Sequence, residues 1–311
     1  MSTHPVHYRA GINDSSRWNG FVFRPDDIVI SVPSKCGTTW LQMICALLVF
    51  QSPELPAPLS SLSPWLDMRL RPTEQVRSSL DAQTHRRFIK THTPLDGLPV
   101  APGVTYIVAG RDARDVAVSM DHHGANLNDS AIQRLLDSGA QTEATPPRSL
   151  PGGPPGGLEH QRERILQWID DDTDPTERLG SLRGTIHHLE SAWRRRHDPD
   201  VILVHYHDLT QDLDAQMREI ARRLDLTAPD DVWSDLVGAA TLSRMRTHSD
   251  VLAPNEGLGL FMDNAKFFRS GSTGQWRGIL TDDDLRHYRE RLHALAPPDL
   301  AVWVESGGVA R

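Results

Sequence analysis

A lysine, a glycine and two threonines stand together in SVPSKCGTTWLQ (31–42), where an apolar run passes into a helical pattern. At the start of that helix the amides of Gly37, Thr38 and Thr39 would point toward an anion, and the helix dipole would favour negative charge there. The ammonium of Lys35 and the two hydroxyls would complete a cradle for a phosphate. The segment therefore predicts an anion site, with an ordinary threonine-capped turn as the structural alternative.

Two other phosphate chemistries need residues that this segment lacks. A nucleoside triphosphate loop of the GxxxxGK[ST] type needs a lysine directly after its second glycine, whereas Thr38 follows Gly37. A phosphatase with Cys36 as its nucleophile would need an arginine six positions later, where Gln42 stands. Each of these alternatives is excluded by the residue at one fixed position.

Lys90 and His92 stand at the end of a second apolar run, RRFIKTH (86–92). A histidine at the edge of a sheet can act as a general base near neutral pH. The chain holds 15 histidines, so a single one is more often structural or exposed. We interpret the clustered histidines elsewhere as structural, because they lack the context of metal ligands: His122, His123, His187, His188, His205 and His207.

Arg111 follows a third apolar run, VTYIVAG (104–110), and Ser119 lies eight residues further on. Arginine provides planar, multidentate recognition of phosphate; a surface salt bridge with a neighbouring aspartate is the alternative. Near the C-terminus, FFRSGSTGQWR (267–277) adds Arg269 and two glycines after an aromatic pair. That segment predicts a loop that closes onto a ligand, with an ordinary surface turn as the alternative.

These residues follow elements that alternate between strand and helix patterns. Short apolar runs predict four buried strands, at 26–33, 86–92, 104–110 and 201–206. Helical spacing of apolar residues predicts helices at 37–51, 112–120 and 208–224. The alternation predicts an α/β fold with a mostly parallel central sheet and helices on both faces. Such sheets bind ligands at the carboxyl ends of their strands, which is where the polar residues above stand.

The length of 311 residues suffices for one large α/β domain, and we predict a single domain over 1–311. One stretch breaks the pattern: EATPPRSLPGGPPGG (143–157) is rich in proline and glycine and predicts a surface loop inside that domain. The net charge of −8 argues against a nucleic-acid partner, which would demand a basic face. It still allows one anionic small-molecule ligand, because a local cluster of cations suffices.

The sequence also bears on where the protein works. MSTHPVHYRAG at the N-terminus has no apolar core of the secretory kind, and the longest apolar stretch, 44–50, is too short to cross a bilayer. Cys36 and Cys45 would lie too far apart along a helix to form a disulfide, and neither belongs to a CxxC pair. We therefore predict a cytoplasmic protein in a reducing compartment, without a membrane span.

Five segments in order resemble the cytosolic sulfotransferases that use 3′-phosphoadenosine 5′-phosphosulfate (PAPS): SVPSKCGTTW, RRFIKTHTPL, YIVAGRDARDVAVSM, VILVHYHDL and FFRSGSTGQW. The resemblance runs from about residue 18 to 295. PLSSLSPWLD and RRFIKTHTPLDGL look closest to the actinobacterial branch described as glycolipid sulfotransferases. The resemblance implies a P-loop-like phosphosulfate-binding loop and transfer of a sulfuryl group from PAPS to a hydroxyl, with release of adenosine 3′,5′-bisphosphate (PAP).

The resemblance also implies a role for each matching residue. His92 would take the proton of the acceptor hydroxyl, while Lys35 and Lys90 would offset charge on the transferring and leaving oxygens. Direct transfer would need neither a covalent enzyme intermediate nor a metal. The donor would be bound by Lys35, Cys36, Gly37, Thr38, Thr39, Trp40, Arg111, Ser119, Tyr206, Thr241, Leu242, Phe268, Arg269, Ser270 and Gly271.

Within that donor set the resemblance separates three parts. The loop 35–39 would hold the 5′-phosphosulfate. Arg111 and Ser119 would hold the 3′-phosphate together with Arg269 and the backbone near Gly271, and Trp40 would stack on adenine near Tyr206. The sequence departs from the family where Cys36 replaces a serine, where Ser270 replaces a lysine and where 240–242 replaces Thr-Ser-Phe. The family's dimer motif is only partly matched at 277–286, so the oligomeric state stays open.

The acceptor implied by the resemblance is a small molecule or a glycolipid, and a lipid acceptor would bring the protein into peripheral contact with a membrane. Its pocket would be built from the Pro/Gly loop, the segment near Trp65 and the region 250–262, with the apolar residues Trp65, Leu66, Leu258, Leu260, Phe261 and Met262. Two alternatives stay open. One is a small-molecule kinase with a related phosphate loop; the other is a non-catalytic homologue that retains the nucleotide site.

Overall fold

Four short apolar strands lie side by side in one sheet, and all of them run parallel. The computed structural model describes residues 5–138, 157–254, 258–269 and 271–308. The strand order is β2-β1-β3-β4, with β1 at Ile28–Ser31, β2 at Phe88–Thr91, β3 at Thr105–Gly110 and β4 at Val201–His205. Nearly every strand residue is buried, as expected of a parallel sheet covered on both faces. The predicted α/β fold is confirmed.

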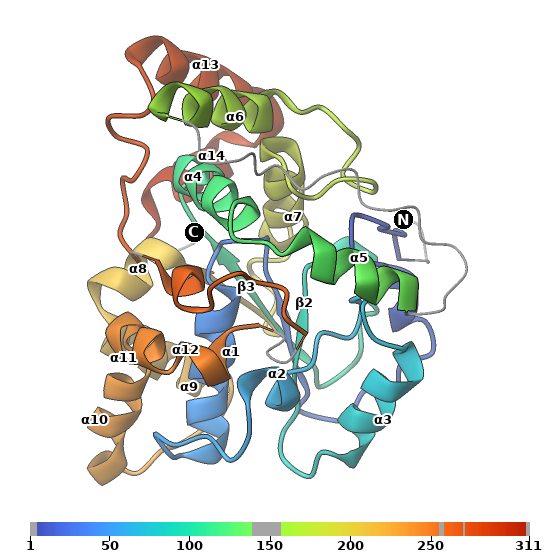
Figure 1. The fold of residues 1–311 in the computed structure, drawn as a ribbon. Coiled ribbons are helices and arrows are strands. Elements are labelled where there is room, and N and C mark those ends of the chain that lie inside the picture. The colour runs from blue at the N-terminus through green and yellow to red at the C-terminus, as the bar shows by residue number, and fades with distance from the viewer. Residues whose placement is uncertain (1–4, 139–156, 255–257, 270, 309–311) are drawn as a thin grey trace.

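Helices connect and cover the strands (Figure 1). They are α1 Thr38–Phe50, α2 Leu59–Leu62, α3 Thr73–Ala82, α4 Ala113–Gly124, α5 Asp129–Ser138, α6 Leu158–Asp170, α7 Leu182–Trp193, α8 Tyr206–Gln211, α9 Leu213–Arg223, α10 Asp230–Ala239, α11 Leu242–Thr247, α12 Ser249–Leu252, α13 Asp282–Leu295 and α14 Pro298–Ser306. In the part of the chain that the structure describes there are also three 3₁₀ turns, at Ser15–Trp18, Leu95–Gly97 and Ala265–Phe268. Among the described residues, no helix is both long and apolar enough to cross a membrane.

The chain leaves the two central strands in opposite directions. From β1 it passes through α1, which packs on β1 and β2, and returns to β2. From β3 it passes through α4 to α7, of which α7 packs on β3 and β4, and returns to β4. Because such parallel crossovers are right-handed, the two sets of helices cover opposite faces of the sheet. The loops after β1 and β3 therefore diverge and open a crevice, which is the usual ligand position in sheets of this kind.

Two local predictions need correction. The single helix expected over 208–224 is two helices, α8 and α9, because Asp212 has a non-helical backbone (φ −148°, ψ 83°) and its side chain caps α9 by accepting a hydrogen bond from Ala215 N. The four observed strands are each one to four residues shorter than the apolar runs that predict them. Most of the predicted Pro/Gly loop (143–157) lies outside the described residues, which resume at Gly157, the residue before α6.

Two hydrophobic clusters form the interior. The larger one joins the sheet to α1, α4 and α7, among other helices. The smaller one contains Met68, Leu70, Ile132 and Leu260, with Trp65 and Phe261 packed against it. It lies apart from the main core and, as shown below, forms one wall of a cavity.

Candidate active site

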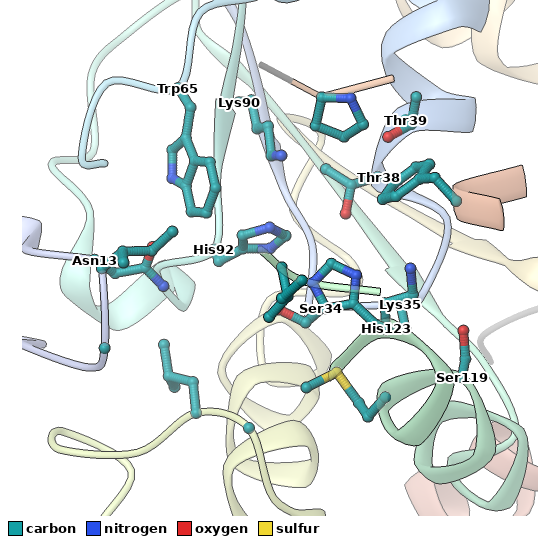
Figure 2. A pocket seen from close by; sticks show the side chains of 18 of the residues that line it. Asn13, Ser34, Lys35, Thr38, Thr39, Trp65, Lys90, His92, Ser119 and His123 are labelled. Atoms are coloured by element: carbon teal, nitrogen blue, oxygen red, sulfur yellow. The ribbon is translucent and has the colours of Figure 1, made fainter. Parts of the chain in front are cut away.

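One cavity of about 760 Å³ gathers the polar residues that follow β1, β2 and β3. Lys35 comes after β1, Lys90 and His92 stand at the end of β2, and Arg111 follows β3; Ser119 reaches the cavity from α4. Figure 2 shows several of these side chains converging on the same space. Residues separated by up to 84 positions in the sequence are thus brought together by the parallel sheet, because equivalent strand ends meet at one edge.

The loop before α1 has the geometry of an anion cradle. Gly37 adopts a left-handed conformation (φ 101°) at the helix start, and no side chain caps the first amides of α1. Thr38 and Thr39 line the cavity directly beyond it. Lys35 also has a positive φ of 67°, which turns the chain sharply between the strand and the helix. An uncapped N-terminus of a 13-residue helix beside a lysine is suited to phosphate or sulfate oxygens.

The ammonium of Lys35 lies in an environment that disfavours its charge. Burial lowers the pKa of Lys35 to about 7, helped by the nearby cations Arg111 and Lys90. The Nζ atom lies 4.3 Å from the centroid of the Phe267 ring, which provides a weak cation–π contact. At neutral pH the charged and neutral forms of this lysine are therefore both populated, and an anion bound beside it would favour the charged form.

The buried Arg111 guanidinium connects the loop after β1 to the segment that contains Ser272. Its Nη1 donates to the carbonyl oxygen of Lys35 at 3.1 Å and its Nη2 to that of Ser272 at 3.3 Å. Its guanidinium carbon lies 4.2 Å from the centroid of the Tyr206 ring. These contacts hold a permanent cation at the cavity wall, as an anion site requires.

The salt-bridge alternative for Arg111 does not hold, because both neighbouring aspartates have other partners. Asp112 caps α4 and pairs with Arg114 at 2.8 Å. Asp115 is fully buried and accepts hydrogen bonds from the amides of Gly274 and Gln275, at 2.8 and 2.7 Å. Asp115 therefore fastens the loop that contains Arg269 and Gly271 against α4. This anchoring role has no signal in the sequence.

Two aromatic side chains form a further wall of the same cavity. Trp40 donates from its indole Nε1 to the carbonyl oxygen of Ala240 at 2.8 Å. Its ring meets Tyr206 edge-on, with 5.3 Å between the ring centroids. Both residues line the cavity next to Leu242. A fixed indole and phenol beside an anion cradle could accommodate a nucleobase.

His92 is oriented as a hydrogen-bond acceptor toward the cavity. Its Nδ1 lies 2.5 Å from the carbonyl oxygen of Val32. A carbonyl oxygen only accepts, so Nδ1 must carry the hydrogen, and Nε2 of the neutral ring is free to accept a proton. Burial, reinforced by the nearby charge of Lys90, holds the pKa of His92 well below its ordinary value. The imidazole is therefore neutral at pH 7, the form that a general base needs.

Lys90 contacts the Trp65 ring and is influenced by the buried carboxylate of Asp67. Its Nζ lies 4.2 Å from the centroid of the Trp65 ring, and that ring meets His92 edge-on at 4.8 Å. Burial lowers the pKa of Lys90 to about 8, while the Asp67 carboxylate acts in the opposite direction. Asp67 is fully buried and accepts hydrogen bonds from Thr91, Thr93 and Trp18. It fixes the end of β2 and partly balances the charge of Lys90.

Most residues of the predicted donor set face this one cavity. Those that line it are Lys35, Gly37, Thr38, Thr39, Trp40, Arg111, Ser119, Tyr206, Leu242, Phe268, Arg269 and Gly271. Cys36 is fully buried and does not line the cavity. The side chain of Thr241 is used to cap α11, and Ser270 lies outside the described residues.

Several cavity residues were not predicted from the sequence. His123, interpreted there as structural, lines the cavity and its ring contacts those of Phe261 and Phe267. A signal did exist, because His123 is four residues after Ser119 on α4 and so shares its face. Asn13 also lines the cavity (Figure 2), and nothing in the local sequence pattern singles it out.

The far part of the cavity is largely apolar. Trp65, Leu260 and Phe261 line it as expected. Leu66 instead belongs to the buried core, Leu258 only packs against the smaller cluster, and Met262 is 66% exposed. Further apolar lining comes from residues that were not predicted: Leu70, Met120, Leu127, Ile132, Met245 and Phe267. Within the described ranges, no cluster of three or more His, Cys, Asp or Glu side chains is arranged to hold a metal ion.

Comparison with known proteins gives a consistent result. The family model described as "Sulfotransferase domain" matches residues 25–296 of this chain. A glycolipid sulfotransferase of Mycobacterium bovis is 41% identical over 322 aligned positions, which cover 98% of this chain and 97% of that protein. A glycolipid sulfotransferase of Mycobacterium tuberculosis is 42% identical with the same coverage. The crystal structure of mouse sulfotransferase SULT7A1 complexed with PAP has a similar fold, with a TM-score of 0.68, 19% identity and coverage of 93% of this chain and 90% of that one.

Proposed function

We propose, because this chain belongs to the sulfotransferase domain family, that it transfers a sulfuryl group from PAPS to a hydroxyl of a glycolipid or a smaller acceptor. The observation that supports this most directly is the composition of one cavity. It combines an uncapped helix start, two lysines, several arginines that include Arg111 and Arg269, and a neutral histidine, His92, whose Nε2 can accept a proton.

The donor would occupy the part of the cavity between the β1 and β3 loops. The helix start and Lys35 are suited to the 5′-phosphosulfate, and Arg111, Ser119 and Arg269 to the 3′-phosphate. Trp40 and Tyr206 would flank adenine. The donor supplies an activated sulfuryl group, and each of these residues binds or orients it through charge, hydrogen bonds or stacking.

His92 would start the reaction at the acceptor. Its Nε2 takes the proton from the acceptor hydroxyl as that oxygen forms a bond to sulfur, and the bond from sulfur to the 5′-phosphate oxygen breaks. The electron pair of the broken bond stays on the phosphate, which leaves as part of PAP. Lys35 and Lys90 lie where they could offset the charge that develops on the leaving and transferring oxygens.

A glycolipid acceptor fits the remaining space. The smaller hydrophobic cluster, with Leu70, Ile132 and Leu260, gives one wall of the cavity an apolar surface that could accommodate an acyl or alkyl chain. Glycolipid is also the acceptor class in the names of two relatives that match nearly the whole chain. We further propose that the enzyme works in the cytoplasm, which accords with its two free, buried cysteines.

Transfer of radiolabelled sulfate from PAPS tests the function. Purified protein is incubated with [³⁵S]PAPS and a panel of phenols, steroids, sugars and glycolipids, and labelled products are separated by chromatography. We expect labelled product with glycolipids. Calorimetry with PAP and with ATP distinguishes the alternatives: a kinase would prefer ATP with Mg²⁺, and a non-catalytic homologue would bind PAP without labelling any acceptor.

Replacing Arg111 with alanine is expected to weaken PAP binding by roughly 10- to 150-fold. A hydrogen bond to a charged group contributes about 1.5–3 kcal/mol, and the change also releases the β1 loop from the Ser272 segment. Titration calorimetry with PAP measures the effect. Arg218→Ala is the matched control, because Arg218 is exposed, contacts only Asp214 and the Trp233 ring among the described residues, and does not line the cavity. Equal PAP affinity in the two variants would contradict the assignment of Arg111.

Gly271→Ala is expected to weaken PAP binding without unfolding the protein. Gly271 has a positive φ of 66°, and an added Cβ would lie 1.9 Å from Leu242 Cδ2, so that Leu242 must rotate within the cavity lining. Such overpacking costs about 1–3 kcal/mol. The control is Gly278→Ala, which has a similar φ of 81° but open space around the new Cβ. If both variants bound PAP equally well, the contact with Leu242 would be irrelevant to the donor site.

A further inference from the structure

The carboxamide oxygen of Asn13 is a buried polar atom without a hydrogen-bond partner among the described residues. Asn13 is only 8% exposed and lines the cavity. Its Oδ1 is buried, and its side chain makes no hydrogen bond to any residue that the structure describes. A buried polar group left unpaired is destabilising, and native proteins rarely retain one without a reason. The orphaned amide therefore indicates a partner that binds inside the cavity.

The backbone around Asn13 is fixed, so the side chain cannot easily turn away. Asn13 forms an isolated β-bridge with Met68 and donates its amide hydrogen to the carbonyl oxygen of Ala10 at 3.0 Å. The amide of Arg69 in turn donates to Ile12 at 2.8 Å. These contacts dock the segment 9–13 on the segment that follows Trp65, and Figure 2 shows Asn13 among the cavity side chains together with Trp65 and His92.

The chemistry of a carboxamide selects among ligands. Its oxygen accepts and its nitrogen donates hydrogen bonds. A hydroxyl does both, so one or two hydroxyls can satisfy both ends of Asn13. A phosphate, sulfate or carboxylate only accepts and would leave Oδ1 unpaired. Arg9 and Arg69 line the cavity from the same two segments.

We propose that Asn13 binds a second hydroxyl of the acceptor, so that the cavity selects polyhydroxylated headgroups such as sugars over acceptors with a single hydroxyl. This assignment rests on the sulfuryl-transfer function proposed above. Trp65 contacts His92. The apolar chain of the acceptor lies along the smaller hydrophobic cluster, against which Ile12 and Trp65 also pack. The acceptor is thereby held by its headgroup near the base and by its chain along Leu70 and Ile132.

The test compares two acceptors in two variants. Octyl β-glucoside offers several hydroxyls, and 4-pentylphenol offers one. The ratio of kcat/KM for the glucoside to that for the phenol should fall about tenfold in Asn13→Ala, the effect of losing one hydrogen bond, and the loss should lie mainly in KM. Asn13→Asp, which keeps the shape but loses the donor, should also lower the ratio. Asn19→Ala, an exposed asparagine of the same N-terminal segment, is the control.

The outcomes separate a binding role from a structural one. Because Asn13 loses no hydrogen bond in the free protein, the Tm of Asn13→Ala should equal or exceed that of the wild type. A lowered Tm with equal loss on both acceptors, or an unchanged ratio, overturns the proposal. If the wild type labels 4-pentylphenol but neither labels nor binds octyl β-glucoside in the presence of PAP, only this inference fails.

Binding measurements keep the proposal testable without turnover. If wild-type protein binds PAP but labels neither acceptor, calorimetry of octyl β-glucoside with the PAP-bound protein decides. Weaker binding by Asn13→Ala supports the role of Asn13, and equal binding, or none to the wild type, overturns it. If wild-type protein does not bind PAP at all, it is the proposed function that fails.

Discussion

Replacing His92 with alanine is expected to reduce kcat for sulfuryl transfer by about 10²- to 10⁴-fold, the usual contribution of a positioned general base. The structure provides the reason: Nδ1 is held by the Val32 carbonyl oxygen, so Nε2 is the proton acceptor. PAP binding should survive, because His92 is not among the residues predicted to bind the donor. Turnover is measured with [³⁵S]PAPS and PAP affinity by calorimetry.

The matched control for this variant is His293→Ala, an exposed histidine on α13. It should retain wild-type turnover and shows that losing a histidine is not harmful in itself. If His92→Ala kept the turnover of His293→Ala, His92 would not be the base. If the variant lost PAP binding to the same degree as turnover, the role of His92 would be to maintain the conformation at the end of β2 and not to accept the proton.

The pH dependence of the wild type gives a second check on His92. Its pKa is held well below the ordinary 6.5 by burial and by Lys90. A base is active when unprotonated, so lowering the pKa extends the active range toward acid. We therefore expect no decline of kcat/KM as the pH falls through 6.5, and a decline only below that value. A decline centred on 6.5 would indicate an exposed, unperturbed histidine.

The donor half of the site could be predicted from the sequence because it follows strand ends. Lys35, His92 and Arg111 each stand directly after an apolar run, and a parallel sheet brings such positions to one edge whatever the length of the connections. The turn at Gly37 also has a local signature, since glycine before a helix start with a nearby lysine predicts an anion site. These inferences need only the alternation of elements.

The acceptor half depends on contacts that leave no local pattern. Asn13 reaches the cavity because its segment pairs with Met68, 55 residues away, and Phe267 reaches Lys35 across the sheet edge. Asp115 looks like an ordinary acidic residue in the first turn of α4, yet its carboxylate accepts hydrogen bonds from the amides of Gly274 and Gln275. The break at Asp212 was missed for a related reason, because apolar spacing alone does not show that a cap interrupts the helix.

Lys35→Met is expected to lower kcat by about 10²- to 10³-fold, as for the loss of one group that stabilises transition-state charge. It should also abolish a proton uptake that accompanies PAP binding. Burial and the neighbouring cations place the pKa of Lys35 at about 7. A bound anion favours the charged form and raises that pKa. Above pH 7, binding should therefore take up close to one proton, and PAP affinity should fall as the pH rises.

Calorimetry of PAP binding at pH 8 in buffers of different ionisation enthalpy measures this proton uptake. Lys266→Met is the matched control, because Lys266 is exposed and does not line the cavity. The control should keep most of the uptake that Lys35→Met loses. Equal uptake in wild type and Lys35→Met would show that the Lys35 ammonium does not face the donor's anionic groups. The proposed phosphosulfate site at the start of α1 would then not include Lys35.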